Sequence, residues 1–323
     1  MNRREFLAAG AACAASPLLP ARALADTYPA RPVRLVVGYA PGGSTDITAR
    51  IIGPWLAERL GQSFVIENRP GAGTNIATES VVKAAPDGYT LLMVTVASTI
   101  NATLYDNLSF VFLRDITPVA GVERQTNIVL AHPSLLVKNI PELIAHAKDN
   151  PGKITMASAG VGSFGHLAGE LLQMMAGIKL VHVPYRGAGP AMTDLLGGQV
   201  QTSVIGLAGA LPHVRSGKLR ALAVTAATRS AVLPDVPAVG ESVPGYEASD
   251  WFGIGAPNGT PPAIIDRLSQ TVAAGLATPE IIKHFADLGG TPLVMAPAAF
   301  GKLLAEETEK WGKVVRAANI KPG

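Results

Sequence analysis

From residue 33 onward, short apolar runs rich in Val, Ile and Leu alternate with segments whose apolar residues recur at helical spacing. Residues 33–37 form the first such run. Ile47 and Ile51 begin the helical spacing of the next segment, which Gly61 ends. This alternation is typical of βαβ units, in which helices cover a parallel sheet. The pattern therefore predicts an α/β fold.

The same layout of strand, Gly-rich loop and helix occurs in a second unit that begins near Asn127. Residues 251–256 are predicted to cross back, so that the two C-terminal helices pack on the first unit. Two crossings between two domains form a hinge with a cleft. We therefore expect two α/β lobes, the first built from residues 26–125 and 251–323, and the second from residues 126–250.

Residues 1–25 resemble an export signal of the twin-arginine type. Arg3 and Arg4 precede a short apolar run, and Ala23-Leu24-Ala25 supplies a cleavage site. Because prolines interrupt this short run, it does not fit a membrane span. We expect cleavage and a soluble periplasmic protein. Cleavage also removes the one cysteine, Cys13, which excludes disulfides, thiolate catalysis and Cys-ligated metals from the remaining chain.

The charge balance excludes nucleic acid as a partner. Among 323 residues, 27 are Lys or Arg and 24 are Asp or Glu, a net charge of +3, whereas binding of a phosphate backbone needs a dense basic surface. The histidines show no H-x-x-x-H or H-E-x-x-H spacing, so zinc catalysis has no support. The Gly-rich loops lack a Walker lysine and a G-x-G-x-x-G motif. We therefore expect no cofactor and no metal.

The loop at residues 39–46, Tyr-Ala-Pro-Gly-Gly-Ser-Thr-Asp, joins the first strand to its helix. Ligands of α/β proteins bind at such junctions. Free backbone amides and the helix dipole attract a carboxylate or phosphate, and glycine lets it approach the backbone. Ser44 and Asp46 also suit helix capping, which is compatible with ligand contact. The loop therefore predicts an anion site.

Ser163 and His166 raise the alternative of an exported serine hydrolase. The surrounding sequence, Val-Gly-Ser-Phe-Gly, lacks the first glycine of G-x-S-x-G, and the histidine of such a triad comes from a later segment. We favour Ser163 as a helix cap or ligand donor and His166 as polar lining in the first helical turn. Tyr185 and Arg186 are candidates to close over a carboxylate, with a solvated surface turn as the alternative.

Five segments, taken in order, resemble the Bug receptors, which are periplasmic solute receptors of tripartite tricarboxylate transporters. They are YAPGGSTD at residues 39–46, ENRPGAG at 67–73, PDGYTLL at 86–92, VPYRG at 183–187 and GKLRALAVT at 217–225. The resemblance covers nearly all of the chain after the export signal. It implies a type II periplasmic-binding-protein fold whose two lobes close on a small carboxylate.

The resemblance also implies where the ligand binds. One carboxylate would meet backbone amides and waters in the loop from Ala40 to Ser44, and the loops at residues 158–163 and 185–187 would complete the pocket, with residues 68–75 and 95–99 on the first-lobe side. The predicted binding residues are Tyr39, Ala40, Pro41, Gly42, Gly43, Ser44, Asp46, Asn68, Gly73, Thr74, Asn75, Thr95, Ser98, Ser158, Gly160, Gly162, Ser163, His166, Tyr185, Arg186, Gly187 and Ile205.

Ile205 stands where amino-acid-binding relatives of that family often carry an Asp. An unpaired ligand ammonium would be costly in such an apolar place, so we expect a carboxylate with an uncharged remainder. The resemblance thus predicts a receptor, not an enzyme. The receptor would be a monomer that delivers a small organic carboxylate to membrane permease subunits. A ligand sensor for a signalling partner remains an alternative role.

Overall fold

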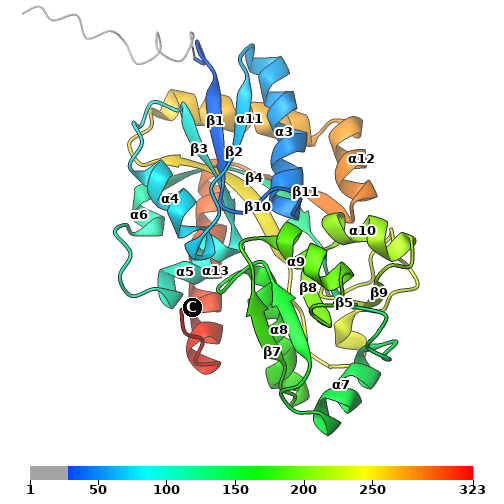
Figure 1. The fold of residues 1–323 in the computed structure, drawn as a ribbon. Helices are drawn as coiled ribbons and strands as arrows, with labels where there is room; N and C mark the ends of the chain where they lie inside the picture. Colours follow the sequence, from blue (N-terminus) through cyan, green and yellow to red (C-terminus); the bar gives the residue numbers. More distant parts are fainter. Residues whose placement is uncertain (1–27, 323) are drawn as a thin grey trace, which may run out of the picture.

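The computed structural model describes residues 28–322, and the expected export signal lies outside this range. Two mixed β-sheets form the cores of two lobes (Figure 1). The first sheet has the spatial order β11 (Gly290–Met295), β4 (Ile116–Gln125), β10 (Asp250–Pro257), β3 (Thr90–Thr95), β1 (Val33–Val37) and β2 (Phe64–Asn68). The second has the order β7 (Val181–Pro184), β6 (Thr155–Ser158), β8 (Thr202–Gly206), β5 (Asn127–Ala131) and β9 (Arg220–Val224).

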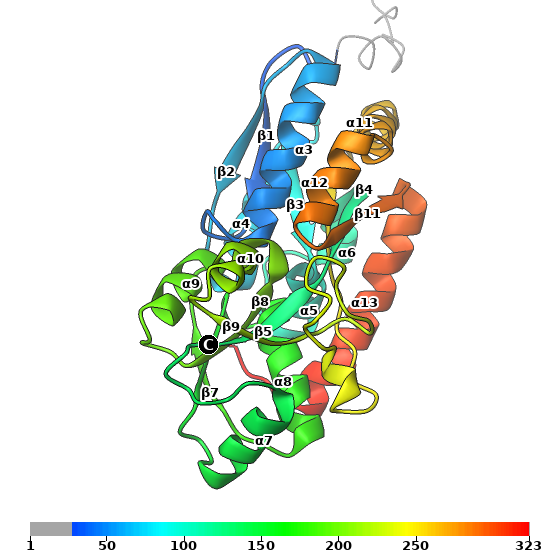
Figure 2. The same cartoon turned by 90° about the vertical axis from the view of Figure 1, so that its right-hand side faces the viewer.

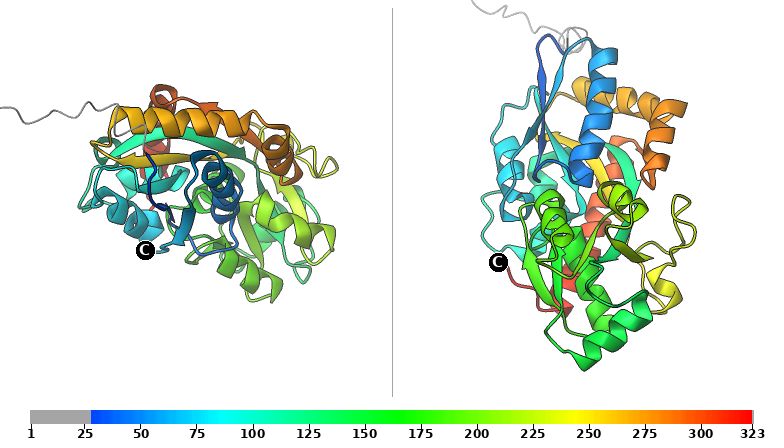
Figure 3. Two further views of the ribbon diagram at one scale, coloured as in Figure 1. Left: turned by 90° about the horizontal axis from the view of Figure 1, so that it is seen from above. Right: turned by 45° about the vertical axis from the view of Figure 1, so that its right-hand side comes forward.

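Helices cover both faces of each sheet, as the views in Figure 3 show for the first lobe. On the first sheet, one face carries α3 (Ser44–Leu60), α11 (Pro262–Leu276) and α12 (Pro279–Asp287), and the other carries α4 (Asn75–Val82), α5 (Val96–Leu104) and α13 (Pro297–Ala317). On the second sheet, one face carries α9 (Ala188–Leu196) and α10 (Leu207–Arg215), and the other carries α7 (Ile140–Asp149) and α8 (Phe164–Ala176). Short helical turns are α6 (Phe112–Asp115), η1 (Ala72–Thr74) and η2 (Val239–Glu241).

The continuous apolar runs in the sequence follow from this layering. Val33, Leu35 and Val37 of β1 pack with α3 and α11, whereas Val36 packs with α4, α5 and α13. Successive side chains of a strand point to opposite faces, so a strand with helices on both sides is apolar at nearly every position; the exposed Arg34 is the exception in β1. Within residues 28–322, no helix combines the length and apolar character that a bilayer span requires.

The two lobes are joined where β4 ends and β5 begins, with only Thr126 between them. The chain returns at the start of β10, where Asp250 lies opposite Gln125 in an antiparallel pair. The return segment is tied to the outgoing one, because the N–H of Thr225 donates to the carbonyl of Asn127 at 2.9 Å and that of Ala248 donates to the carbonyl of Thr225 at 3.0 Å. The crossings therefore lie side by side at one point between the lobes.

Helix α13 makes another contact between the lobes, separate from the two chain crossings. It packs on β4 and α5 of the first lobe and reaches α8 of the second (Figure 2). The rings of Trp311 and Phe164 meet edge to face there, with centroids 5.8 Å apart and an interplanar angle of 86°. A C-terminal helix of the first lobe thus also contacts the second lobe.

Most of the predicted elements are present at or near their predicted bounds. The strand at residues 33–37 has the predicted limits, and the helix after it ends at Leu60, directly before Gly61. Strand β5 begins at Asn127, and β10 spans the crossing predicted at residues 251–256. The sequence interpretation missed the strands β4, β8 and β11 and the helices α5, α6, α10 and α12. The missed α5 and α10 follow β3 and β8 directly, with no Gly- or Pro-rich loop to separate them.

Glu123 is a buried carboxyl near the C-terminal end of β4, with 1% of its surface exposed. The hydroxyl of Thr48 in α3 donates to its Oε2 at 2.5 Å. Burial raises the pKa of Glu123 to about 8 despite this hydrogen bond. Because the folded protein holds the proton more tightly than the unfolded chain, Glu123 contributes stability below its ordinary pKa and loses that contribution as pH rises towards 8.

We predict that Glu123→Gln weakens the fall in melting temperature between pH 5 and pH 9. Gln has a similar shape but does not ionise, so the variant does not lose stability when pH rises. Each kcal/mol of unfolding free energy that is retained corresponds to roughly 2–4 °C in melting temperature. Differential scanning calorimetry of the wild type and the variant measures the effect. Glu58→Gln, at an exposed site on α3, is the control and should follow the wild type; equal pH profiles for all three proteins would contradict the prediction.

Candidate functional site

A cavity of about 50 Å³ lies between the lobes. Both lobes and both crossings contribute to its walls. We call it the central cavity, and its lining residues are Tyr39, Gly43, Ser44, Thr45, Thr95, Ala97, Gln125, Asn127, Ala159, Ser163, Phe164, Gly165, Ala188, Val204, Ile205, Gly206, Asp250 and Phe252.

Five helices begin at the central cavity. The lining includes residues at the N-termini of α3, α5, α8, α9 and α10. The N–H groups of a first helical turn have no partner within the helix, and the N-terminus carries a partial positive charge. No Lys, Arg or His side chain lines this cavity among residues 28–322. The cavity is therefore suited to an anion held by backbone donors.

The loop before α3 is held by a carboxylate outside the cavity. Asp46 accepts from the N–H of Gly42 at 3.0 Å and from Arg50 Nε and Asn68 Nδ2 at 2.9 Å each. Asn68 Nδ2 also donates to the carbonyl of Tyr39 at 3.0 Å. Partial burial opposes the ionised form, but these hydrogen bonds outweigh it and lower the pKa of Asp46. Asp46 and Asn68 therefore position the loop and do not line the cavity.

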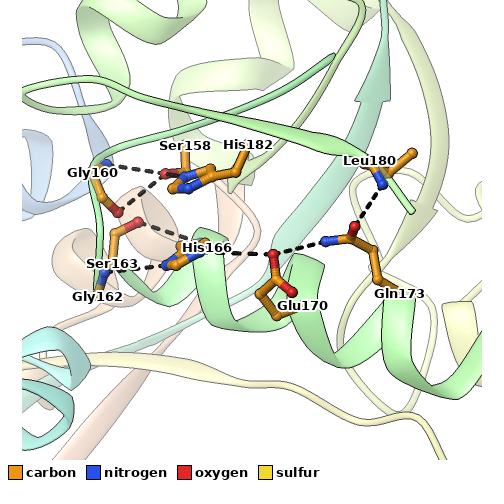
Figure 4. Close-up of polar contacts among 9 residues, drawn as sticks. All are labelled: Ser158, Gly160, Gly162, Ser163, His166, Glu170, Gln173, Leu180 and His182. Atoms are coloured by element: carbon orange, nitrogen blue, oxygen red, sulfur yellow. Dashed lines mark hydrogen bonds and ion pairs between the residues drawn. The ribbon is translucent and has the colours of Figure 1, made fainter. Parts of the chain in front are cut away.

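The second-lobe loop at residues 158–163 rests on two stacked histidines (Figure 4). The rings of His166 and His182 are parallel within 8°, with centroids 3.8 Å apart. His182 Nε2 lies 2.6 Å from Ser158 Oγ, which accepts from the N–H of Gly160 at 3.1 Å. Burial lowers the pKa of His166 to about 3 and that of His182 to about 4. Two neutral rings thus support the loop near pH 7.

Ser163 and His166 do not form a nucleophile and base pair in this structure. Ser163 caps α8, accepting from the backbone N–H of His166 at 3.3 Å. Nδ1 of the His166 ring accepts from the N–H of Gly162 at 3.3 Å, and Nε2 faces Glu170 at 3.8 Å (Figure 4). The expected cap is confirmed, whereas the ring of His166 lies behind the loop, outside the lining of the central cavity.

Other predicted residues lie around a second hollow, the outer pocket, which shares Tyr39 and Ala159 with the central cavity. Its lining includes Gly73, Thr74, Gly160, Tyr185 and Arg186. The Tyr185 hydroxyl donates to Asp194 at 2.6 Å, and burial together with this carboxylate raises the pKa of Tyr185 to about 12. The Arg186 carbonyl accepts from the N–H of Ala40 at 3.1 Å, a bond between the lobes.

The remaining predicted residues have structural contacts. Gly42 lies in a third hollow beside Ser44 and Ile205. Ser98 accepts from the N–H of Thr95 at 3.5 Å, and Asn75 accepts from Asn101 at 3.1 Å. Ala40, Pro41, Ser158, Gly162 and Gly187 belong to the loops that approach one another but are not in the central lining.

The sequence analysis missed the polar floor of the cavity. Gln125, Asn127 and Asp250 are 2%, 2% and 8% exposed and all line the cavity. Phe252 lines it as well. The run Glu-Arg-Gln-Thr-Asn at residues 123–127 was the available signal, since such polarity is unusual between two buried strands.

The comparisons with known proteins point to one family. The family model described as "Tripartite tricarboxylate transporter family receptor" matches residues 48–320. Protein BugT of Bordetella pertussis is 37% identical over 324 residues, with 99% of each chain covered. Rpa4515 of R. palustris, solved with adipate, is 37% identical with a TM-score of 0.89, covering 92% of this chain and 100% of that chain. MatC from Rhodopseudomonas palustris, with bound malate, is 34% identical with a TM-score of 0.85, covering 89% and 100%.

These matches agree with the architecture described above. The expected type II periplasmic-binding-protein fold, with two α/β lobes around a ligand cleft, is confirmed by the two sheets and by likeness to a solved periplasmic binding protein, BugD, at a TM-score of 0.88. The resemblance seen in the five sequence segments is confirmed by the family model, which spans most of the chain. The chain belongs to the receptor family of the tripartite tricarboxylate transporters.

Proposed function

We propose that this protein is a periplasmic receptor that captures a small organic carboxylate between its lobes and delivers it to permease subunits in the membrane. The observation that carries the proposal is the convergence of five helix N-termini on one cavity that no cationic side chain of residues 28–322 lines. Buried backbone donors of this kind suit a carboxylate. Family membership and the adipate and malate named for two relatives support the same ligand class.

The site in this proposal combines the central cavity and the outer pocket. The first lobe contributes the loop from Tyr39 to Ser44, and the second contributes Ser163 and Ile205. Lobe boundaries near Thr126 and Asp250 fit the crossings between the two sheets. We also propose that residues 1–25 are an export signal, that the protein is a monomer and that it catalyses no reaction.

Lobe closure in this proposal depends on small residues at the contact. An added Cβ at Gly189 in α9 would lie 2.5 Å from the Pro41 carbonyl of the other lobe, and one at Gly187 would lie 2.8 Å from the Ala40 nitrogen. These distances are shorter than ordinary van der Waals contact, so the closed arrangement requires glycine there. A ligand that touches both lobes favours this arrangement by its difference in affinity for the two states.

We predict that small carboxylates raise the melting temperature of the protein. A ligand at about 100 times its Kd adds roughly 2.7 kcal/mol of stability, which corresponds to several degrees. A thermal-shift screen with mono-, di-, tri- and aromatic carboxylates measures this, with the corresponding neutral alcohols as controls. A screen in which no carboxylate shifts the transition would remove the main support for the proposal.

We predict that Gly189→Ala weakens binding of the carboxylate found in that screen by about tenfold or more, because its methyl group meets Pro41 only when the lobes are closed. Gly197→Ala, at the other end of α9, is the matched control, since its added Cβ meets nothing closer than 3.5 Å. Isothermal titration calorimetry gives the two affinities. Equal loss of affinity in both variants would speak against closure at this contact.

We predict that the protein does not hydrolyse an activated ester through Ser163. The hydroxyl caps α8, and the imidazole of His166 is engaged with Gly162. Release of p-nitrophenol from p-nitrophenyl acetate should be equal for the wild type and Ser163→Ala. Turnover by the wild type that Ser163→Ala abolishes would restore the hydrolase alternative.

A further inference from the structure

The floor of the central cavity carries an acid that the anion site does not explain. Asp250 opens β10, lies opposite Gln125 of β4, and accepts a hydrogen bond at 2.9 Å from the N–H of Trp251. It is 8% exposed and lines the cavity together with Gln125 and Asn127. These three side chains come from the two crossings, so the floor belongs to the hinge.

No cation compensates this carboxyl within the part of the chain that the structure describes. The titratable groups that face it are the Tyr39 phenol from the loop after β1, Glu123 from β4 and Glu307 from α13. Burial above all, with a smaller effect of Glu307, raises the pKa of Asp250 to about 7. Its ionised form is therefore costly even before an anionic ligand enters.

The partial positive charges of the helix N-termini determine which ligand group binds favourably beside this floor. Five partial positive charges point at a cavity of about 50 Å³. A ligand ammonium beside Asp250 would lie within this positive field. A ligand carboxylate beside an ionised Asp250 would place two anions in one buried space. A neutral Asp250, which donates its O–H to a ligand oxygen, avoids both conflicts.

The side chain of Gln125, which lies opposite Asp250, carries buried polar atoms without a partner among residues 28–322. Both atoms of its side-chain amide are buried and have no hydrogen-bond partner among residues 28–322, as is also true of the Ser44 hydroxyl. An added Cβ at Gly206 would lie 1.9 Å from Ser44 Oγ and 2.5 Å from Gln125 Oε1, so these groups surround one point. Buried polar groups of this kind are normally satisfied by a ligand or water.

We propose that Asp250 and Gln125 form a second subsite, which binds an oxygen acceptor at the far end of the ligand with Asp250 as the neutral acid. The proposal rests on the proposed function and deepens it. The ligand carboxylate meets the helix N-termini, and its other oxygen-bearing group meets the floor. Binding above neutral pH then transfers one proton from solvent to Asp250, and amino acids that would place an ammonium at the floor are rejected.

The test is calorimetric titration of the protein with malate and with adipate at several pH values, each in two buffers of different ionisation enthalpy. At pH 8, we expect uptake of nearly one proton per ligand bound, and between pH 6 and pH 9 the Kd should rise by roughly a hundredfold. In Asp250→Asn, proton uptake should vanish, and the ratio of the Kd values at pH 9 and pH 6 should fall to about one. Asp266→Asn, at an exposed site on α11, should keep the pH dependence of the wild type.

Three results would overturn the proposal. They are binding without proton uptake at every pH, a pH dependence that Asp250→Asn retains, and tighter binding of aspartate or glutamate than of malate and adipate. Absence of both heat and a thermal shift with malate and with adipate also overturns the subsite, because each carries an oxygen acceptor opposite a carboxylate. The proposed function itself fails only if the wider carboxylate panel gives no thermal shift, so the two failures are distinguishable.

Discussion

A carboxylate that leaves water must exchange its hydrogen bonds to solvent for donors that are already in place, or the transfer is unfavourable. We propose that the donors in this protein are backbone N–H groups at the starts of the five helices that line the central cavity. They carry no counter-charge that must itself be desolvated, and the backbone holds them fixed. The two sheets, their Gly-rich junctions and the crossings all place helix starts at this point.

Fixed donors also require fixed loops. The carboxylate of Asp46 takes three hydrogen bonds behind the first loop, and the neutral pair His166 and His182 supports the opposite one. The charged and titratable groups of these supports face away from the cavity lining. Neither support enters the lining of the central cavity, and the lobes approach closely because glycines lie between them.

Local patterns predicted the parts of the fold and site that depend on neighbours in sequence. The apolar runs of β1 and β3 and the loop before α3 are such parts, because a strand buried on both faces and a Gly-rich helix start are each visible within ten residues. The polar floor was missed because Asp250 and Gln125 meet only after both crossings have formed. His182 was missed as a support of the binding loop for the same reason, since its partner lies on another element. Ile205 lines the central cavity together with Asp250, but its apolar character gave no sign of that acid.

The edge-to-face contact of Trp311 with Phe164 links two places that are otherwise far apart in the chain. Phe164 is at once a wall of the central cavity and the neighbour of Trp311, whose own helix is anchored on the first lobe. A rearrangement of the lobes must slide or separate these rings, at a cost of about 0.5–1.5 kcal/mol beyond the area they bury. The C-terminal helix therefore acts as a strut across the hinge. Its indole is a natural fluorophore at the lobe boundary, in contact with a residue that lines the central cavity.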